Sequence, residues 1–435
     1  MIEQNKNIAI WGWGKEGIAA ARFLQKRNIN FTLLNDEDPE THSFLENVKD
    51  VVVGKEIQQK IKDFDVVIKS PGVSLYRKEI QQNKNRVHFT SVTNLWFELY
   101  GSRFTTIIIT GTKGKSTTAS LFAHILRNQG FAVTLAGNIG QPLLGTPLDS
   151  NFYVIELSSY QAADLKYSAS INILLNLYPE HLDWHKSVAK YFHDKTSIFR
   201  LNGTNIVNAD CMSENTAYSN IYNTKDSYHA TVEGIFHGKN RIISCDEISL
   251  EGVHNYTNIC AIFTAFSFLN LPVEKIKTPL KTFTPLEHRL QKIETPQGIY
   301  VSDSISTTPE STIAAIETFS NYRVTLILGG QDRGLDWKGF AKKLQNLNLH
   351  FIITTYQSGK KIYDFLQKLG YKNTTYIDEL GSAILLANKV NTPSGIILFS
   401  PAAPSYDAFT NYKEKGDFFV HQVKANEDTL KKNDH

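Results

Sequence analysis

The sequence predicts an α/β protein built from three domains in series. The chain has 435 residues, which is about three times a common domain length. Short β-rich runs alternate with helical stretches, a pattern typical of parallel sheets with helical crossovers. Two of the β-rich runs end in glycine-bearing turns that open a helix, as in nucleotide-binding domains. We expect the domains at residues 1–94, 95–285 and 286–435.

Composition and charge exclude several classes of protein. The chain is 41% hydrophobic and 20% charged, with 46 Lys+Arg against 43 Asp+Glu. No basic stripe of the kind that binds nucleic acid is visible, and no apolar run reaches the 18 residues of a membrane span. The three cysteines lack metal-ligand spacing, and the N-terminus lacks the pattern of a signal peptide. We expect a soluble, cytoplasmic protein that binds no nucleic acid and has no membrane span.

The first two domains are predicted from strand-like apolar runs and helical spacing. In the first domain we expect a helix over 17–27 and strands over 8–11, 31–34, 51–53 and 66–68. A helix over 94–103 leads into the second domain. There the run at 105–110 is almost purely β-branched, as a strand buried on both faces should be, and further strands are expected over 153–157 and 171–177.

The rest of the second domain and the third domain show different patterns. A helix is expected over 188–199, and the polar segment 201–250 predicts small antiparallel strands and loops. Apolar spacing over 255–269 predicts another helix. The third domain again alternates helical patterns with strands, expected over 299–301, 324–328, 351–354, 376–377 and 396–399.

The clearest motif follows the β-branched run and reads GTKGKST. Glycines in such a turn let backbone N–H groups converge on phosphate oxygens, and the helix that follows adds the positive end of its dipole. Lys115 would reach the β- and γ-phosphates of ATP, and the Ser116 hydroxyl would bind Mg²⁺. The full P-loop has a glycine five residues before Gly114, where this chain has Ile109, so the loop is a shortened version. We interpret it as a nucleotide-binding loop rather than a glycine turn with surface lysines.

A second glycine turn lies near the N-terminus. It has the form Gly12-x-Gly14-x-x-Gly17 after a strand, and Asp36 ends the next strand, where dinucleotide-binding folds place a ribose-binding acid. The pattern indicates a turn that accepts a pyrophosphate but does not say which nucleotide binds there.

Two further segments end strands of the second domain. Glu156 opens ELSSYQ and is placed to bind Mg²⁺ beside the phosphate loop, although a helix-capping role is the alternative. The segment NLYPEHLDWH holds two acids and two histidines, including His181. Because the carboxyl ends of parallel strands meet at one edge of a sheet, we expect these residues to share one crevice.

Taken together, these segments resemble a known family. GTKGKST, AGNIG (136–140), ELSSYQ, EHLDWH, HNYTN (254–258) and EHRL (287–290) occur in the order found in Mur ligases, the ATP-dependent amide-bond synthetases of peptidoglycan precursor assembly. The resemblance covers residues 7 to about 420. It implies a Rossmann-like UDP-binding domain, a P-loop ATPase-like central domain and a Rossmann-like C-terminal domain that binds the amino acid.

The resemblance also implies roles for individual residues. ATP binding is assigned to Gly111, Thr112, Lys113, Gly114, Lys115, Ser116, Thr117, Asn258, Arg289 and Asp303. The UDP-linked substrate is assigned to Gly12, Trp13, Gly14, Lys15, Asp36, Asn138, Ser158 and Gln161. Glutamate is assigned to Thr307, Arg333, Ser405 and Tyr412.

Two Mg²⁺ sites follow from the same resemblance. Ser116 and Glu156 would hold the first ion, and His181 the second. Lys195 matches the family's carbamylated lysine, in which a CO₂ adduct turns an ammonium, which cannot bind Mg²⁺, into an anion that can. The implied catalytic set is therefore Lys115, Glu156, His181 and Lys195.

The third domain indicates the branch of the family. VSDSISTTPEST (301–312) and SPAAPSYDAFTNYKEKG (400–416) resemble the glutamate-adding member, which extends UDP-N-acetylmuramoyl-L-alanine through an acyl phosphate. Ile305 and Arg333 stand where the usual D-glutamate enzyme has lysines. Arg binds carboxylate in a fixed bidentate geometry, so the amino-acid site is re-aimed. These departures favour L-glutamate, with D-glutamate as the alternative.

Three other functions stay open at this point. A folylpolyglutamate synthetase-like ligase shares the P-loop and the domain plan, but it does not explain the N-terminal domain. An NAD-dependent oxidoreductase rests on the first glycine turn alone. A non-catalytic P-loop binding protein would not need His181 or Lys195.

Overall fold

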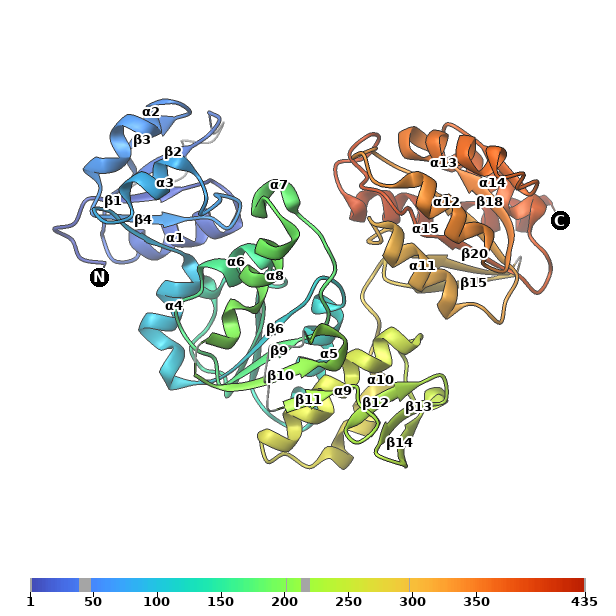
Figure 1. Cartoon of the computed structure of the whole chain (residues 1–435), viewed down its shortest axis with the longest axis horizontal. Coiled ribbons are helices and arrows are strands. Elements are labelled where there is room, and N and C mark those ends of the chain that lie inside the picture. Colours follow the sequence, from blue (N-terminus) through green and yellow to red (C-terminus); the bar gives the residue numbers. More distant parts are fainter. Residues whose placement is uncertain (1, 39–47, 201, 213–219, 297, 434–435) are drawn as a thin grey trace. The chain divides into compact units, whose positions relative to one another are not determined.

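The computed structural model describes residues 2–38, 48–200, 202–212, 220–296 and 298–433 (Figure 1). The chain divides into two compact units. The first comprises Met1–Ala230, Ile235–Ser244 and Thr257–Lys281, and the second comprises Thr231–Gly234, Cys245–Tyr256 and Thr282–His435. No helix in the described part of the chain is both long and apolar enough to cross a membrane.

The first sheet of the first unit is parallel, with the strand order β3-β2-β1-β4-β5. Its strands are Ile8–Trp11, Phe31–Asn35, Val48–Val53, Val66–Lys69 and His88–Thr90, for β1 to β5. The helices are α1 (Lys15–Gln25), α2 (Glu56–Lys60), α3 (Lys78–Asn83) and α4 (Val92–Tyr100). Apolar side chains are buried on both faces of this sheet, as the continuous apolar strands predict.

The elements expected for this sheet are present, with differences at their ends. Helix α1 begins two residues before the predicted start at 17. Strand β5 was not expected, because three residues with a histidine among them carry little periodicity. The predicted domain boundary at 94/95 falls inside α4, whose Ser91 caps it by accepting from the Asn94 N–H.

The second sheet is also parallel and has the order β11-β10-β9-β6-β8-β7. Its strands are Thr105–Thr110, Val133–Gly137, Phe152–Glu156, Ile171–Leu174, Thr204–Asn208 and Asn220–Tyr222, for β6 to β11. The helices between them are α5 (Lys115–Asn128), α6 (Ser159–Asp164), α7 (Leu182–His185) and α8 (Val188–Thr196). Strand β9 ends three residues before the predicted 177.

The expectation for residues 201–250 is partly wrong. Strand β10 pairs parallel to β9, and β11 pairs parallel to β10, so both extend the second sheet instead of forming a small antiparallel one. The sequence of a short strand does not show which neighbouring strand it will pair with. Whether the pairing is parallel or antiparallel is therefore decided by the tertiary structure. The remaining strands of this segment do form a small sheet, from β12 (Tyr228–Thr231), β13 (Gly234–His237) and β14 (Asn240–Ser244).

Two helices follow this small sheet along the chain. Helix α9 covers Val253–Phe268, close to the predicted 255–269, and α10 covers Lys277–Thr282. Between His254 and Phe268 most positions of α9 are apolar, which explains why its spacing was visible in the sequence.

The second unit contains a third sheet, ordered β15-β16-β20-β17-β18-β19. The β15–β16 pair is antiparallel and the other pairs are parallel. The strands are Gln291–Thr295, Gly298–Ser302, Val324–Leu328, Leu349–Thr354, Thr374–Tyr376 and Ile396–Phe399, for β15 to β20. The helices are α11 (Pro309–Thr318), α12 (Trp337–Gln345), α13 (Tyr356–Lys368), α14 (Leu380–Val390) and α15 (Tyr412–Asn433). Apolar cores cover both faces of this sheet.

Candidate active site

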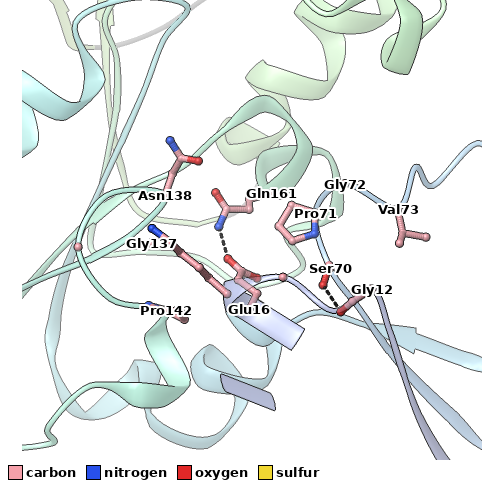
Figure 2. Close-up of a pocket in the computed structure, with 13 residues that line it drawn as sticks. Gly12, Glu16, Ser70, Pro71, Gly72, Val73, Gly137, Asn138, Pro142 and Gln161 are labelled. Atoms are coloured by element: carbon pink, nitrogen blue, oxygen red, sulfur yellow. Dashed lines mark hydrogen bonds between the residues drawn. The ribbon is translucent and has the colours of Figure 1, made fainter. Parts of the chain in front are cut away.

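A cavity of 440 Å³ opens at the carboxyl ends of β1 and β4, where the strand order of the first sheet reverses. This is the place where open α/β sheets bind ligands. Figure 2 shows Gly12, Ser70 and Val73 on one side of it, with Gly137, Asn138 and Gln161 across from them. The cavity therefore draws on the ends of both the first and the second sheet.

The glycines of the N-terminal turn are required by its geometry. Gly12 has φ +96°, and a Cβ at Gly17 would lie 2.0 Å from the Gly12 carbonyl oxygen. The Ser70 hydroxyl donates to that same oxygen at 2.9 Å. Only glycine fits so close an approach, and the tight turn leaves the N-terminus of α1 facing the cavity.

The predicted residues of the UDP site divide into two groups. Gly12, Gly14, Lys15, Asn138 and Gln161 line the cavity, whereas Trp13, Asp36 and Ser158 do not. Trp13 packs against the apolar core of the first sheet. Asp36 instead forms an ion pair with Arg77 at 2.7 Å.

Glu16 lines the same cavity and was not singled out from the sequence. Its side chain is 9% exposed, and its Oε1 accepts from the Gln161 Nε2 at 2.5 Å (Figure 2). Burial raises the pKa of Glu16 to about 7, although the Gln161 hydrogen bond and the charge of Lys69 act in the opposite direction. Lys69 is itself buried and pairs with Asp164 at 3.0 Å. A lone Glu after a glycine turn gives no sequence signal for this arrangement.

The phosphate loop lies between β6 and α5, as predicted. Gly114 has a left-handed backbone with φ +80° and is the N-cap of α5, so the helix begins at Lys115. Asn176, in the loop after β9, holds this turn in place. Its Oδ1 accepts from the Lys113 N–H at 2.7 Å, and its backbone oxygen accepts from the Thr112 N–H at 3.0 Å. The Lys115 Nζ donates to the Thr112 carbonyl at 2.8 Å.

Asn258 of α9 lies against the same loop. A Cβ added at Gly114 would come within 2.4 Å of the Asn258 Nδ2, and Asn258 is 6% exposed. The structure thus brings together two residues of the predicted ATP set that are far apart in the sequence.

Glu156 ends β8 next to the loop and is fully buried. Its Oε1 accepts from the Asn138 Nδ2 at 2.7 Å, while its Oε2 has no hydrogen-bond partner among the described residues. A buried carboxylate oxygen without a partner is costly unless a cation or water satisfies it. Glu156 therefore fits the predicted role as a Mg²⁺ ligand.

His181 and Glu180 follow β9. His181 has a left-handed backbone, and burial lowers its pKa. Glu180 was not assigned a role from the sequence, yet it forms an ion pair with Lys113 at 2.8 Å. Burial alone would raise the pKa of Glu180, but the charges of Lys113 and His181 lower it.

Lys195 lies in the last turn of α8 with a side chain that is 1% exposed. Its Nζ donates to the Gly111 carbonyl of the phosphate loop at 2.8 Å. Burial, together with the positive charge of Lys115, lowers the pKa of Lys195 well below its usual range. The sequence of α8 taken alone would place Lys195 on a solvated helix face, but the packing of the helix buries it.

A hydrogen-bond chain supports this helix and was also missed. The Tyr76 hydroxyl donates to Asp194 at 2.6 Å, and Asp194 Oδ2 lies 2.7 Å from the His185 Nδ1. The other ring nitrogen of His185 is 2.9 Å from the Ser159 hydroxyl at the start of α6. The chain joins α8, which carries Lys195, to α6, which carries Gln161.

The described residues contain no group of three or more His, Cys, Asp and Glu side chains that could hold a metal. The predicted metal set does not take that form, since it includes a serine hydroxyl and a lysine. The charges of Lys115, Glu180 and Glu156 all act on the pKa of Lys195, so these groups lie within electrostatic reach of its amine.

The predicted glutamate residues lie in the second unit. Arg333 follows β17 and is exposed, with its guanidinium 5.5 Å from the Tyr406 ring. The two acids nearest to Arg333 in the sequence hold other groups. Asp332 pairs with Lys361 and accepts from the Trp337 Nε1, and Asp336 caps α12.

The other members of this set differ in exposure. Ser405 follows β20 and is 2% exposed, and its hydroxyl has no hydrogen-bond partner among the described residues. Thr307 is half-buried, and Tyr412, at the start of α15, is 38% exposed.

Asp303 directly follows β16 and is 4% exposed. It accepts from the Ser400 hydroxyl at 2.8 Å and from the Leu290 N–H at 3.3 Å. Burial raises the pKa of Asp303 to about 6 in spite of these hydrogen bonds. Its carboxylate is thus engaged inside the second unit, and its predicted contact with ATP stays a prediction.

Three family models match successive parts of the chain. The N-terminal domain of MurD-like Mur ligases matches residues 6–89, the Mur ligase middle domain matches 109–266, and the glutamate ligase domain of Mur ligases matches 288–403. These matches cover well over half of the chain.

The protein is a Mur ligase.

Curated relatives of this Mur ligase align along almost the whole chain. A protein of Xanthomonas oryzae pv. oryzae is 36% identical and covers 96% of this chain and 95% of its own length. A protein of Xylella fastidiosa (strain 9a5c) is 34% identical and covers 95% of this chain and 94% of its own length. A protein of a Micromonospora species is 31% identical and covers 97% of this chain and 97% of its own length. All three are named UDP-N-acetylmuramoyl-L-alanine–L-glutamate ligase.

Solved structures share the fold. The UDP-N-acetylmuramate–alanine ligase of Thermotoga maritima superimposes with a TM-score of 0.62 at 21% identity, covering 97% of this chain and all of that one. A MurF ligase of the same organism, solved with ADP, gives a TM-score of 0.64 at 12% identity, covering 98% and 96%. At such identities the likeness shows the α/β three-domain architecture and nothing finer.

Family membership confirms the predicted class of enzyme. Mur ligases form amide bonds with ATP and Mg²⁺ in peptidoglycan precursor synthesis, and they act on small-molecule substrates. A Mur ligase accounts for both glycine turns, whereas an NAD-dependent oxidoreductase would account for the first turn only.

Proposed function

We propose that this Mur ligase joins glutamate to the alanine carboxylate of UDP-N-acetylmuramoyl-L-alanine, in the cytoplasm and as a monomer. The observation that carries the proposal is the phosphate loop with Lys195 donating to the Gly111 carbonyl at 2.8 Å and Glu156 buried beside it. The names of the relatives, which align over nearly the whole chain, support the choice of substrates. A folylpolyglutamate synthetase-like ligase is disfavoured by the N-terminal domain match.

The work is divided among the three predicted domains. Residues 1–94, with Asn138 and Gln161 from the next domain, bind the UDP-linked substrate in the 440 Å³ cavity. Residues 95–285 bind ATP on the phosphate loop. Residues 286–435 bind glutamate through Arg333, Thr307, Ser405 and Tyr412, with Arg289 and Asp303 contributing to the nucleotide site.

Two Mg²⁺ ions would be held at the carboxyl edge of the second sheet. Ser116 and the unpartnered Oε2 of Glu156 fit the first ion, and His181 fits the second. Lys195 would join the second site as a carbamate, which a buried amine with a lowered pKa favours, because only the neutral amine adds to CO₂. Bound Mg²⁺ neutralises negative charge on the phosphates.

The chemistry proceeds in two steps. The alanine carboxylate attacks the γ-phosphorus of ATP, which forms an acyl phosphate and releases ADP. The glutamate amine then attacks the acyl carbon and phosphate leaves, so the amide forms at the expense of one ATP. Lys115 would stabilise the charge on the phosphates during transfer, and the loop N–H groups would hold them in line.

L-glutamate is the preferred amino acid in this proposal, with D-glutamate as the alternative. The relatives' names specify L-glutamate. Arg333 offers a planar fork that can grip a carboxylate with two hydrogen bonds, and Ile305 removes a cation from the place where the D-glutamate enzyme has one. The enantiomer is set by a difference between two affinities, so these two positions are enough to change it.

The test is ADP release with UDP-N-acetylmuramoyl-L-alanine and a panel of L- and D-amino acids. We expect release that depends on L-glutamate, and none from Lys115→Ala, with exposed Lys62→Ala as the matched control that retains activity. A strong preference for D-glutamate would overturn only the choice of enantiomer. Release that ignores glutamate, or persists in Lys115→Ala, would overturn the function.

A further inference from the structure

The carboxyl group of Glu16 has a hydrogen-bonding arrangement that fixes which oxygen can carry a proton. Gln161 Oε1 accepts from the Ser158 N–H at 2.9 Å and from the Ser158 hydroxyl at 3.0 Å, so its Nε2 is the end that faces Glu16. That Nε2 donates to the Glu16 Oε1, which must therefore be an acceptor. A proton on Glu16 can lie only on Oε2.

Oε2 is the oxygen of Glu16 that could interact with a ligand. It is buried and has no hydrogen-bond partner among the described residues, while Glu16 lines the 440 Å³ cavity (Figure 2). An ionised carboxylate with one bare, buried oxygen is costlier than the neutral acid, and only the acid can donate a hydrogen bond from Oε2 to an acceptor on a ligand.

The rest of the cavity is built for an anion. Its walls include Gly12 and Gly14 of the turn, Gly137 at the end of β7, Gly140 in the loop after it, and the positive N-terminus of α1. Lys15 lines it as well. An ionised Glu16 would oppose the same anion that these groups attract.

We propose that Glu16 binds the UDP-linked substrate as a neutral carboxylic acid, whose Oε2 hydroxyl donates a hydrogen bond to an acceptor oxygen of the diphosphate-bearing substrate. The inference deepens the proposed function and rests on it, because it needs a diphosphate in this cavity. Binding then takes up one proton from solvent whenever Glu16 is ionised in the free protein.

The charged groups that act on Glu16 leave this proton available near neutral pH. Lys69 at the end of β4 favours the carboxylate, and Asp164 on α6 favours the acid, and these two pair with each other at 3.0 Å. The N-terminus of α1 also favours the carboxylate. Burial outweighs these influences and raises the pKa of Glu16 to about 7 in the free protein.

The experiment is calorimetric titration with UDP-N-acetylmuramoyl-L-alanine in buffers of different ionisation enthalpy, without ATP. Neither the diphosphate diester nor the carboxylate of this substrate titrates near neutral pH, so proton exchange reports on the protein. We expect uptake of about 0.9 protons at pH 8 and about 0.1 at pH 6. The Kd should rise about 25-fold between pH 6.5 and 8.5, if the complex stays protonated throughout.

Glu16→Gln is the decisive variant, because its amide accepts from Gln161 and donates to the cavity as the neutral acid does. We expect the variant to bind the UDP-linked substrate without Glu16-linked proton uptake and to keep a low Kd at pH 8.5. At that pH the variant should bind the substrate more tightly than the unaltered protein does. The control is Glu56→Gln on α2, whose side chain is 68% exposed, and it should retain the uptake.

The outcomes separate the two proposals. A protein that neither binds nor turns over this substrate at any pH refutes the proposed function and this inference with it. Binding and turnover without proton uptake at pH 8, or with uptake that persists in Glu16→Gln, refute the inference alone. If thermal unfolding shows that Glu16→Gln does not fold, proton uptake on substrate binding and the pH dependence of Kd in the unaltered protein still test the inference.

Discussion

Gly114 and Gly130 offer a matched pair of substitutions at the two ends of α5. Both have a left-handed backbone, with φ +80° and +86°. A Cβ at Gly130 would meet nothing within 4 Å, whereas a Cβ at Gly114 would lie 2.4 Å from the Asn258 Nδ2. Alanine would therefore be under the same backbone strain at both positions, but only at Gly114 would it collide with a neighbouring side chain.

The two substitutions should have different consequences for ATP. Alanine in a left-handed conformation costs about 1–2 kcal/mol of stability at either site. Gly114→Ala must in addition move Asn258 by about 1 Å to reach ordinary contact distance, and Asn258 is 6% exposed with little room to yield. Loss of one hydrogen bond from Asn258 to the nucleotide corresponds to about 1–1.5 kcal/mol, or roughly a tenfold rise in the KM for ATP.

The assay combines denaturant unfolding with steady-state ADP release for both variants. We expect similar losses of stability, and a raised KM for ATP in Gly114→Ala only. The KM values for glutamate and for the UDP-linked substrate should stay near those of the unaltered protein. An unchanged KM for ATP in Gly114→Ala, or an equal rise in Gly130→Ala, would show that the contact between the loop and Asn258 does not shape the nucleotide site.

Three further predictions concern charged side chains. Lys195→Ala should be inactive and partly rescued in an ADP-release assay by acetate, which can replace the carbamate as an anionic ligand; full activity would return Lys195 to a structural role. Arg333→Lys keeps the charge but loses the planar fork, so glutamate affinity should fall by about 1–3 kcal/mol while ATP is unaffected; an unchanged KM for glutamate would exclude the contact. Burial lowers the pKa of Lys415 to about 8, below its value of 10.5 in the unfolded chain. Unfolding then takes up a proton between these pH values, so the free energy of unfolding should rise with pH in that window, by up to about 3 kcal/mol. Denaturant unfolding at pH 8 and 10 checks this, and Lys415→Met should abolish the rise.

Local sequence determined the parts of this protein that depend on short-range geometry. The β-branched run 105–110 is a strand with the predicted bounds, and Gly114 and Lys115 start a helix because the turn needs a left-handed glycine there. The N-terminal turn is likewise dictated by Gly12 and Gly17, where a Cβ would collide with the chain. Periodicity and turn chemistry act within a few residues, so a single sequence carries them.

Tertiary structure alone decided which residues meet. Glu16 and Gln161 are 145 residues apart, and Lys195 lies 84 residues from the Gly111 carbonyl that it binds. Strands β10 and β11 joined the parallel second sheet because β9 offered an edge, which nothing in their own sequence specifies. Burial of a charged side chain depends on all the elements packed around it, and it is burial that shifts Glu16 and Lys195 from ordinary surface charges to groups that can exchange a proton or react near neutral pH.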